Sequence, residues 1–431
     1  MPRQKSAALE RFALSNGLRV VVAPDASSQL VGVAVVYDVG WRSEPAGRTG
    51  FAHLFEHMMF QGSANVAKVE HMALVEGAGG VFNGYTRADI TAYFQALPAG
   101  GLELALWLEA DRMGSLAITE ENLANQVAVV KEEINVNVFN QPYGGFPWIV
   151  LPETAFDSYP NSHNGYGAFE ELERASVADA ASFYETYYAP SNAVLAVAGA
   201  CDPAEVAAYA ERFFGPIPLR PVPAHGPWPE PPLSRPRHRL LHDGRAPQPA
   251  FVAGYRSPDP VNRLQDHLAY TVLAGVLAGS DASRLRRRLV HEERIVTDVS
   301  CELGIFGVDN FIMRDPVLLQ VLVMHPGASS TEQILALVDA ELERLADEGP
   351  TRDELERVAA AYSSGYWRSL DAVMERSITL ASLEVVHGRA ELLAELPGRI
   401  AAVAPEAVAA AAGELTGQQR TVVEVVPGAA Q

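Results

Sequence analysis

Lysine is scarce in this chain of 431 residues, and negative charge dominates. Lysine occurs only at positions 5, 68 and 131, and the formal net charge at pH 7 is −20. Nucleic acids and anionic membrane surfaces are themselves negatively charged and would repel such a chain. The composition therefore argues against both as main partners.

Cysteine and long apolar runs are also scarce. The two cysteines, Cys201 and Cys301, are too few for a disulfide framework. No apolar run approaches the roughly 20 residues that span a bilayer. Met1 to Arg11 is short and mixed and lacks the apolar core of a signal peptide. These absences lead us to expect a cytoplasmic protein without a membrane partner.

Proline is concentrated in one stretch, residues 216–236. Such density prevents helix and central strand, and predicts an extended linker. We therefore predict a first domain at residues 1–215, this linker, and a second domain at residues 237–431.

The two halves of the sequence follow one plan. Each half opens with an apolar strand, contains a long amphipathic helix pair, and closes with another strand. Mixed elements of this kind predict an α+β fold with two related domains, each a mostly antiparallel sheet with helices packed on it. The predicted elements are Val31–Tyr37, Leu102–Met113, Glu120–Val136 and Ala193–Ala198 in the first half, and Ala250–Tyr255, Thr331–Glu348, Thr351–Ser364 and Thr421–Val426 in the second.

The stretch His53-Leu54-Phe55-Glu56-His57 carries the most specific signal in the chain. Residues four apart on a helix are neighbours, so His53 and His57 can bind one metal ion together. Glu56 lies at the edge of the same face, where a carboxylate can serve as a base without being a ligand. This order of residues is the inverted form of the zinc-protease helix motif.

Hydrolytic zinc sites have three protein ligands and one open position. The helix expected at residues 120–136 carries two adjacent carboxylates, Glu132 and Glu133. Gln126, Val129, Val130 and Glu133 share one face of that helix. If this face packs toward the histidine helix, Glu133 is favoured over Glu132 as the third ligand.

The chemistry of this set favours hydrolysis over other metal reactions. Zinc lowers the pKa of bound water and polarises a carbonyl group. Glu56 would take the proton from water and pass it to the leaving amine. A two-histidine, one-carboxylate iron oxygenase would leave Glu56 without a task. Isolated histidines such as His71 and His163 are expected to be structural. The corresponding part of the second half, Tyr270–Leu277, has no such motif, which predicts one zinc ion per chain.

Several motifs together resemble the pitrilysin, insulysin and mitochondrial-processing-peptidase family of inverzincins. In that family the third ligand lies about 76 residues beyond the second histidine, which selects Glu133 here. The resemblance implies a two-domain chain forming half of a clamshell, and an endopeptidase that cleaves short or unfolded peptides in a closed chamber. It also implies that Asn83 positions substrate at an edge strand. The matching segments are Leu14–Val20, Gly40–Glu44, Gly50–Met58, Phe82–Thr86 with Thr91 and Tyr93, and Tyr188–Ala193.

The chain departs from the family pattern at three places. Gln126 stands where a second glutamate is usual, and its amide can still bond a ligating histidine. Gly84 replaces the more usual alanine. Val290 and Thr297 stand where self-sufficient members have an Arg and a Tyr that hold the substrate. The chain thus resembles the zinc-bearing subunit of a bacterial heterodimer, whose related partner would supply the Arg/Tyr pair. The alternative is a non-catalytic assembly subunit.

Overall fold

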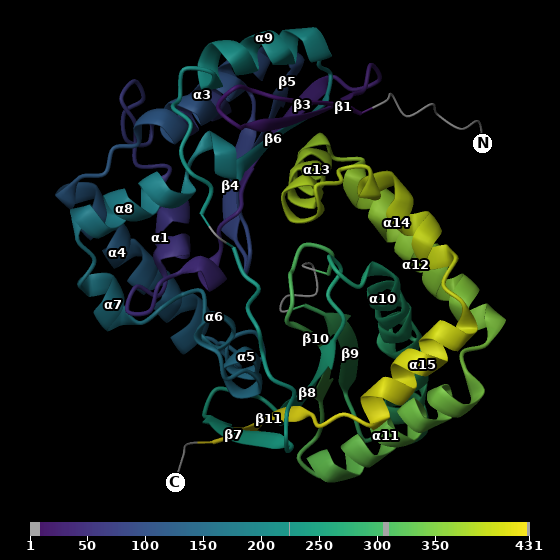
Figure 1. The fold of residues 1–431 in the computed structure, drawn as a ribbon. Coiled ribbons are helices and arrows are strands. Elements are labelled where there is room, and N and C mark those ends of the chain that lie inside the picture. The colour runs from purple at the N-terminus through teal and green to yellow at the C-terminus, as the bar shows by residue number, and fades with distance from the viewer. Residues whose placement is uncertain (1–8, 224, 305–309, 429–431) are drawn as a thin grey trace. The chain divides into compact units, whose positions relative to one another are not determined.

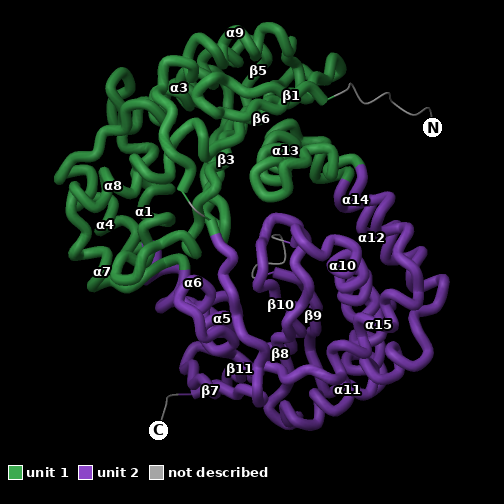
Figure 2. The backbone as a smooth tube through the Cα atoms, in the orientation of Figure 1, with its two compact units in different colours: residues 1–132, 165–225, 367–394 green, residues 133–164, 226–366, 395–431 purple. Residues whose placement is uncertain are grey.

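The computed structural model describes residues 9–223, 225–304 and 310–428 (Figure 1). The prediction about a signal peptide concerns Met1 to Arg11, and most of this segment lies outside the described residues. Contacts divide the chain into two compact units, and each unit takes three stretches of the chain (Figure 2). Unit 1 comprises residues 1–132, 165–225 and 367–394, and unit 2 comprises residues 133–164, 226–366 and 395–431.

A six-stranded sheet forms the centre of unit 1. Its strands are β1 (Glu10–Ala13), β2 (Arg19–Pro24), β3 (Leu30–Tyr37), β4 (Val81–Thr86), β5 (Thr91–Pro98) and β6 (Ala193–Gly199). They lie in the order β1-β2-β6-β3-β5-β4, and only β2 and β6 run parallel. The inner strands β3 and β6 are almost wholly apolar and are buried on both faces. The outer strand β4 alternates between exposed and half-buried residues.

Helices cover both faces of this sheet (Figure 1). Helix α3 (Leu102–Ser115) packs against β3 and β5, where Gln95 donates a hydrogen bond to the Ala105 carbonyl. Helix α13 (Val373–His387) crosses β3, β5 and β6 on the other face. A Cβ at Gly32 would lie only 2.3 Å from the Val373 carbonyl oxygen, so glycine permits this close approach. A helix from the second half of the sequence thus completes the core of unit 1.

Unit 2 is built around a five-stranded sheet. Its strands are β7 (Arg237–Asp243), β8 (Ala250–Ser257), β9 (Asp298–Leu303), β10 (Val317–Met324) and β11 (Thr421–Pro427). Their order is β7-β11-β8-β10-β9, and only β7 and β11 run parallel. This order repeats β2-β6-β3-β5-β4 of unit 1 strand for strand. The predicted α+β class with two related, mostly antiparallel sheets is therefore confirmed.

Helices also pack on the sheet of unit 2. Helix α10 (Leu264–Ala278) is buried along most of its length and contacts β9 and α15 (Pro405–Thr416). Helix α11 (Thr331–Glu348) packs against α15. On β8, Gly254 leaves room for Leu151 of helix α5 (Val150–Ala155), which belongs to an apolar cluster with β11. The remaining α-helices outside the metal-binding group are α2 (Glu70–Gly77), α6 (Tyr159–Ser162), α7 (Phe169–Glu173), α8 (Val177–Tyr187), α9 (Pro203–Phe214), α12 (Arg352–Leu370) and α14 (Leu392–Ala401).

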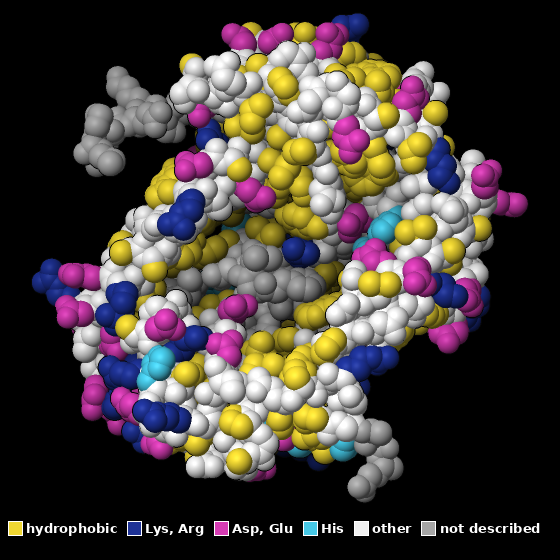
Figure 3. Space-filling view, turned by 180° about the vertical axis from the view of Figure 1, so that it is seen from behind, with side chains coloured by type: hydrophobic (Ala, Val, Ile, Leu, Met, Phe, Trp, Pro, Cys, Tyr) yellow, Lys and Arg dark blue, Asp and Glu magenta, His cyan; other side chains and the backbone are white. Residues whose placement is uncertain are grey.

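The proline-rich stretch behaves locally as its composition predicts. Residues 216–223 and 225–236 contain neither helix nor strand. The division of the sequence into domains at 1–215 and 237–431 stays a prediction, because the contact-based units interleave along the chain. Within the described residues, no helix combines the length and apolar character needed to cross a membrane. On the face drawn in Figure 3, acidic side chains are interspersed with basic ones.

Candidate metal centre

The histidine motif forms helix α1 (Phe51–Met58), as predicted. One face of α1 is apolar and fully buried, with Phe51, Leu54, Phe55 and Met58 at helical spacing. The Phe55 carbonyl accepts a hydrogen bond of 3.0 Å from the Tyr93 hydroxyl of β5. The motif residues occupy the opposite face, where the imidazoles can meet another element.

The start of α1 is anchored by residues whose role sequence reasoning missed. Glu44 is 3% exposed, and its carboxylate accepts hydrogen bonds of 2.8 Å from the N–H groups of Gly50 and Ala52. The Glu171 carboxylate accepts bonds from the Thr49 N–H and hydroxyl. Carboxylates suit a helix N-terminus because unpaired N–H groups and the helix dipole meet there. A signal for Glu44 existed, namely a glutamate shortly before a glycine and a short helix.

Helix α4 (Glu120–Ile134) carries the predicted third ligand. Asn122 donates hydrogen bonds to the carbonyls of Gln61, just after α1, and of Ala117. Val130 is buried, but Val129 is 42% exposed, so the expectation that Val129 lies on the packed face is wrong. The buried stripe runs instead through Leu123, Gln126, Val130 and Ile134.

Glu133 and not Glu132 meets the histidines. Glu132 is exposed, whereas Glu133 is half-buried. The boundary between the two units falls between these residues, but both belong to the continuous helix α4, whose earlier turns lie in unit 1. Because both residues lie on one helix, helical geometry makes their side chains point in different directions.

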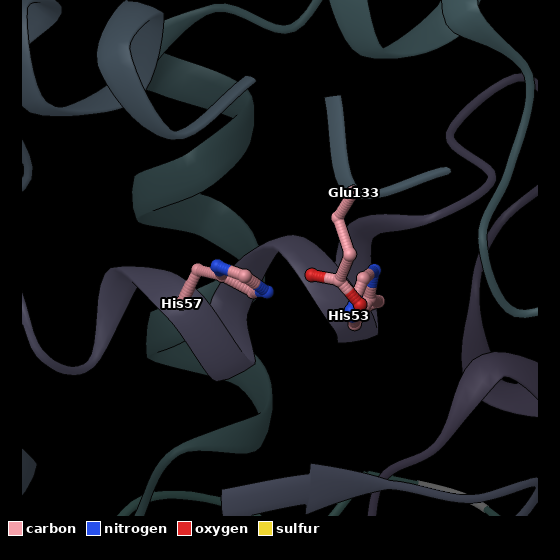
Figure 4. Close-up of side chains that lie close together, drawn as sticks. All are labelled: His53, His57 and Glu133. Atoms are coloured by element: carbon pink, nitrogen blue, oxygen red, sulfur yellow. The ribbon is translucent and has the colours of Figure 1, made fainter. Parts of the chain in front are cut away.

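His53, His57 and Glu133 form one group that suits a metal ion. Each offers one ligand atom, and these three atoms lie within 4.8 Å of one another. In Figure 4 the Glu133 carboxylate points toward the two imidazoles from a separate segment. The imidazole rings are perpendicular, with centroids 4.9 Å apart. Two imidazoles and one carboxylate are a donor set of catalytic zinc sites, so the residues present fit zinc.

Glu56 lies beside this group without being part of it. It is half-buried and sits about 60° around the helix from His53. Burial raises the pKa of Tyr93 and of Tyr188, and the charge of Glu56 adds to the effect on both. Both phenols therefore stay protonated at neutral pH, and Tyr93 remains a hydrogen-bond donor to α1. A carboxylate in this place can accept a proton next to the three ligands.

Asn83 lies on β4, which pairs only with β5 within the described residues. Gly84 opposes Tyr93, whose hydroxyl reaches α1, so Gly84 faces α1. Asn83 opposes Phe94 and lies on the other face of the sheet. Its Oδ1 accepts a hydrogen bond of 2.9 Å from the Gly84 N–H. The predicted edge strand thus exists, and a substrate contact of the Asn83 side chain remains a proposal.

Gln126 lies on the buried face of α4 and is 5% exposed. Its Nε2 donates a hydrogen bond of 2.9 Å to Asn125 Oδ1 of the same helix. The predicted bond from Gln126 to a ligating histidine therefore stays a proposal.

The second half has no guanidinium or phenol at positions 290 and 297. Thr297 accepts a bond from Gln248 and donates one to the Met324 carbonyl. Four arginines nearby engage local carboxylates: Arg284 with Glu354, Arg286 with Asp281 and Asp298, Arg287 with Glu292, and Arg288 with Glu292 and Glu293. Arg294 donates a hydrogen bond to the His291 carbonyl. A small slip in the sequence alignment would thus not yield an unengaged arginine.

The isolated histidine His71 is structural in this fold. It lies on α2 between the rings of Phe60 and Phe82 and is 5% exposed. Burial, assisted by the charge of Arg112, lowers the pKa of His71 from 6.5 to about 3. His163 is half-buried, and its Nδ1 lies 2.7 Å from the Tyr159 carbonyl. Neither residue belongs to the metal group.

Known proteins share both the sequence pattern and the fold. The model described as "Insulinase (Peptidase family M16)" matches residues 19–143, which include all three candidate ligands, and "Peptidase M16 inactive domain" matches residues 174–362. Zinc protease PqqE of Helicobacter pylori is 27% identical over 84% of this chain and 80% of its own length.

Two solved structures superpose on nearly the whole chain. A protease from Helicobacter pylori has a TM-score of 0.88 at 24% identity and covers 98% of this chain and 100% of its own. A peptidase M16 inactive domain from Pseudomonas fluorescens has a TM-score of 0.84 at 16% identity, covering 99% and 100%. Both share the fold. The two family models, which match residues 19–143 and 174–362, show that the chain belongs to peptidase family M16, the pitrilysin and insulysin family.

Proposed function

We propose that this protein is a zinc-dependent endopeptidase that hydrolyses short or unfolded peptides. The observation that carries the proposal is the convergence of His53, His57 and Glu133 within 4.8 Å, with Glu56 beside them. A single zinc ion per chain would be held by these three side chains. Relatives named zinc proteases, such as PqqE of Helicobacter pylori, support this reading.

The residues of the chain divide the work of amide hydrolysis between them. Zinc in a three-ligand site supplies Lewis acidity and an activated water. The Glu56 carboxylate accepts the proton of the attacking water and returns it to the leaving nitrogen. The Gly84 N–H donates a hydrogen bond to the Asn83 side chain, and among the described residues β4 has no partner strand on the side away from β5. An extended peptide can add there as a further strand, with Asn83 at its side.

A related second subunit would complete the substrate site. Val290 and Thr297 cannot donate as an arginine and a tyrosine would. Three arginines before them, Arg284, Arg286 and Arg288, are engaged with carboxylates. Loss of an oxyanion donor costs roughly 10²–10³ in rate. Mixing the chain with a related subunit that carries the Arg/Tyr pair should therefore raise peptide cleavage by about this factor. If the isolated chain cleaves peptides as fast as the mixture, the partner proposal is wrong.

The substitution Glu56→Gln tests the enzymatic proposal. It should lower kcat by roughly 10²–10⁴, because the proton acceptor is lost. Bound zinc should be retained, since Glu56 is not among the three ligands. Glu132→Gln, on the exposed side of α4, is the control and should cleave as the wild type does. Equal cleavage by Glu56→Gln and wild type would refute the proposed role.

The match of residues 174–362 to a domain described as inactive favours one alternative. In that case the chain would be a non-catalytic subunit of a peptidase-like assembly. A zinc-loaded chain that cleaves no peptide, alone or mixed with a related subunit, would support this alternative.

A further inference from the structure

A tyrosine packs directly on one of the candidate ligands. The Tyr166 and His53 rings meet edge to face, with centroids 4.9 Å apart and planes at 86°. His53 is 8% exposed and is the most buried of the three ligands. Tyr166 itself is half-buried and lies in the loop before α7. The His53 imidazole is thus bounded by the His57 ring and by the Tyr166 ring.

The loop that carries Tyr166 is pressed against the turn preceding α1. A Cβ at Gly165 would lie 2.6 Å from Trp41 Cε3, and one at Gly167 would lie 2.3 Å from the Thr49 carbonyl oxygen. Gly167 also has φ +75°, a conformation that other residues rarely adopt. A Cβ at Gly50, in turn, would lie 2.5 Å from the Tyr166 carbonyl oxygen. Glycines on both sides therefore permit an approach that ordinary side chains would block.

A polar network fixes the same loop to the same turn. The Glu171 carboxylate bonds Thr49 at two atoms, at 2.8 and 2.7 Å. The Thr49 hydroxyl also accepts a bond of 3.0 Å from the Ala168 N–H. The segment from residue 165 to 171 is thereby held to the start of α1 at several points. Tyr166 lies within this segment, so its backbone is held beside the start of α1.

We propose that Tyr166 is a positioning residue for the metal ligand His53. The inference rests on the proposed zinc site. Its ring restricts the His53 imidazole to the orientation that faces His57 and Glu133, which lowers the entropy lost when the ligand set closes on a metal. Hydrogen-bonding partners that orient metal ligands typically contribute 10–100-fold in metal affinity, and we expect an effect of similar size from this ring. The contact that carries the proposal is the one between the two rings.

The test compares zinc affinity, measured by competition with a chromophoric chelator, across four proteins. Tyr166→Phe keeps the ring and should bind zinc within about twofold of wild type. Tyr166→Ala removes the ring and should bind about 10–100-fold more weakly. Tyr159→Ala is the matched control, because Tyr159 stacks on His163, which is not a ligand, with centroids 4.4 Å apart. It should leave zinc affinity unchanged.

A second readout uses the zinc-free protein, so that it does not depend on metal or activity. Aromatic rings shift the NMR signals of nearby protons, and the His53 ring protons should move in Tyr166→Ala but not in Tyr166→Phe. If Tyr166→Ala does not fold, Tyr166→Leu keeps most of the volume and should show the same weakening of zinc binding. Unchanged zinc affinity in the ring-deleted variants, or equal losses in Tyr166→Phe and Tyr166→Ala, would overturn the proposal. A wild type that binds no zinc would instead refute the proposed function.

Discussion

Protonation of His71 should be a main cause of acid destabilisation in unit 1. Its ring lies between Phe60 and Phe82, and its Nε2 is buried without a hydrogen-bond partner among the described residues. Arg112 is the cation whose charge further disfavours the imidazolium. Burial and this charge lower the pKa of His71 to about 3 in the folded protein.

The sign and size of the effect follow from that pKa. Below pH 6.5 the unfolded chain takes up a proton at His71 that the folded chain does not. Stability therefore falls as the pH drops from 6.5 toward 3, by about 1.4 kcal/mol per pH unit once well below 6.5. Between pH 7 and pH 5 the loss amounts to about 2 kcal/mol. Above pH 7 the residue contributes no pH dependence.

The substitution His71→Phe isolates this effect, because it keeps a ring between Phe60 and Phe82 and removes the titration. Urea unfolding followed by circular dichroism at pH 7 and pH 5 gives the change in unfolding free energy for each protein. Wild type should lose about 2 kcal/mol more than His71→Phe over this interval. Replacing the exposed His242 by Gln should leave the wild-type loss unchanged. Equal losses in wild type and His71→Phe, or an NMR titration of His71 near pH 6.5, would refute the reasoning.

Further predictions concern the residues that anchor helix α1 and the sheet of unit 1. Glu44→Gln leaves one buried N–H at the start of α1 without its acceptor and should lower the unfolding free energy by about 2 kcal/mol, whereas Glu76→Gln on the exposed side of α2 should change it little. An unchanged melting temperature for Glu44→Gln would contradict this role. Gly32→Ala places a Cβ 2.3 Å from the Val373 carbonyl oxygen and should destabilise by at least about 2 kcal/mol. A Cβ at Gly77 would have no atom within 4 Å, so Gly77→Ala should be neutral or stabilise by up to about 1 kcal/mol. Equal changes in unfolding free energy for Gly32→Ala and Gly77→Ala would contradict the packing argument.

The metal-binding group could be predicted from the sequence because its ligands lie on helices. Helical spacing puts His53 and His57 on one face, and periodicity along α4 separates Glu133 from Glu132. The same periodicity placed Val129 on the packed face, where the structure has it exposed. Apolar character alone could not decide between neighbouring stripes of α4, because Val127, Val129 and Val130 all fit a buried face.

The residues that hold the metal-binding group in place could not be predicted from the sequence, since they depend on contacts between distant segments. Tyr166 meets His53 across more than 100 residues of sequence, and no local pattern links the two. The same limit applies to α13, which the sequence places in the second half but which packs on β3 and β6. Asn83 lies on the face of the sheet away from α1, and predicting this would have required the register between β4 and β5. Local pattern thus predicted the elements, and long-range register decided which side chains meet.

The zinc content of three purified proteins tests the central claim most directly. Wild type and Glu132→Gln should each hold one zinc ion per chain by elemental analysis, because only Glu133 joins the two histidines. Glu133→Gln should lose most of its zinc while keeping its fold. A wild type without zinc, or a Glu133→Gln protein that holds zinc as firmly as wild type, would contradict the account.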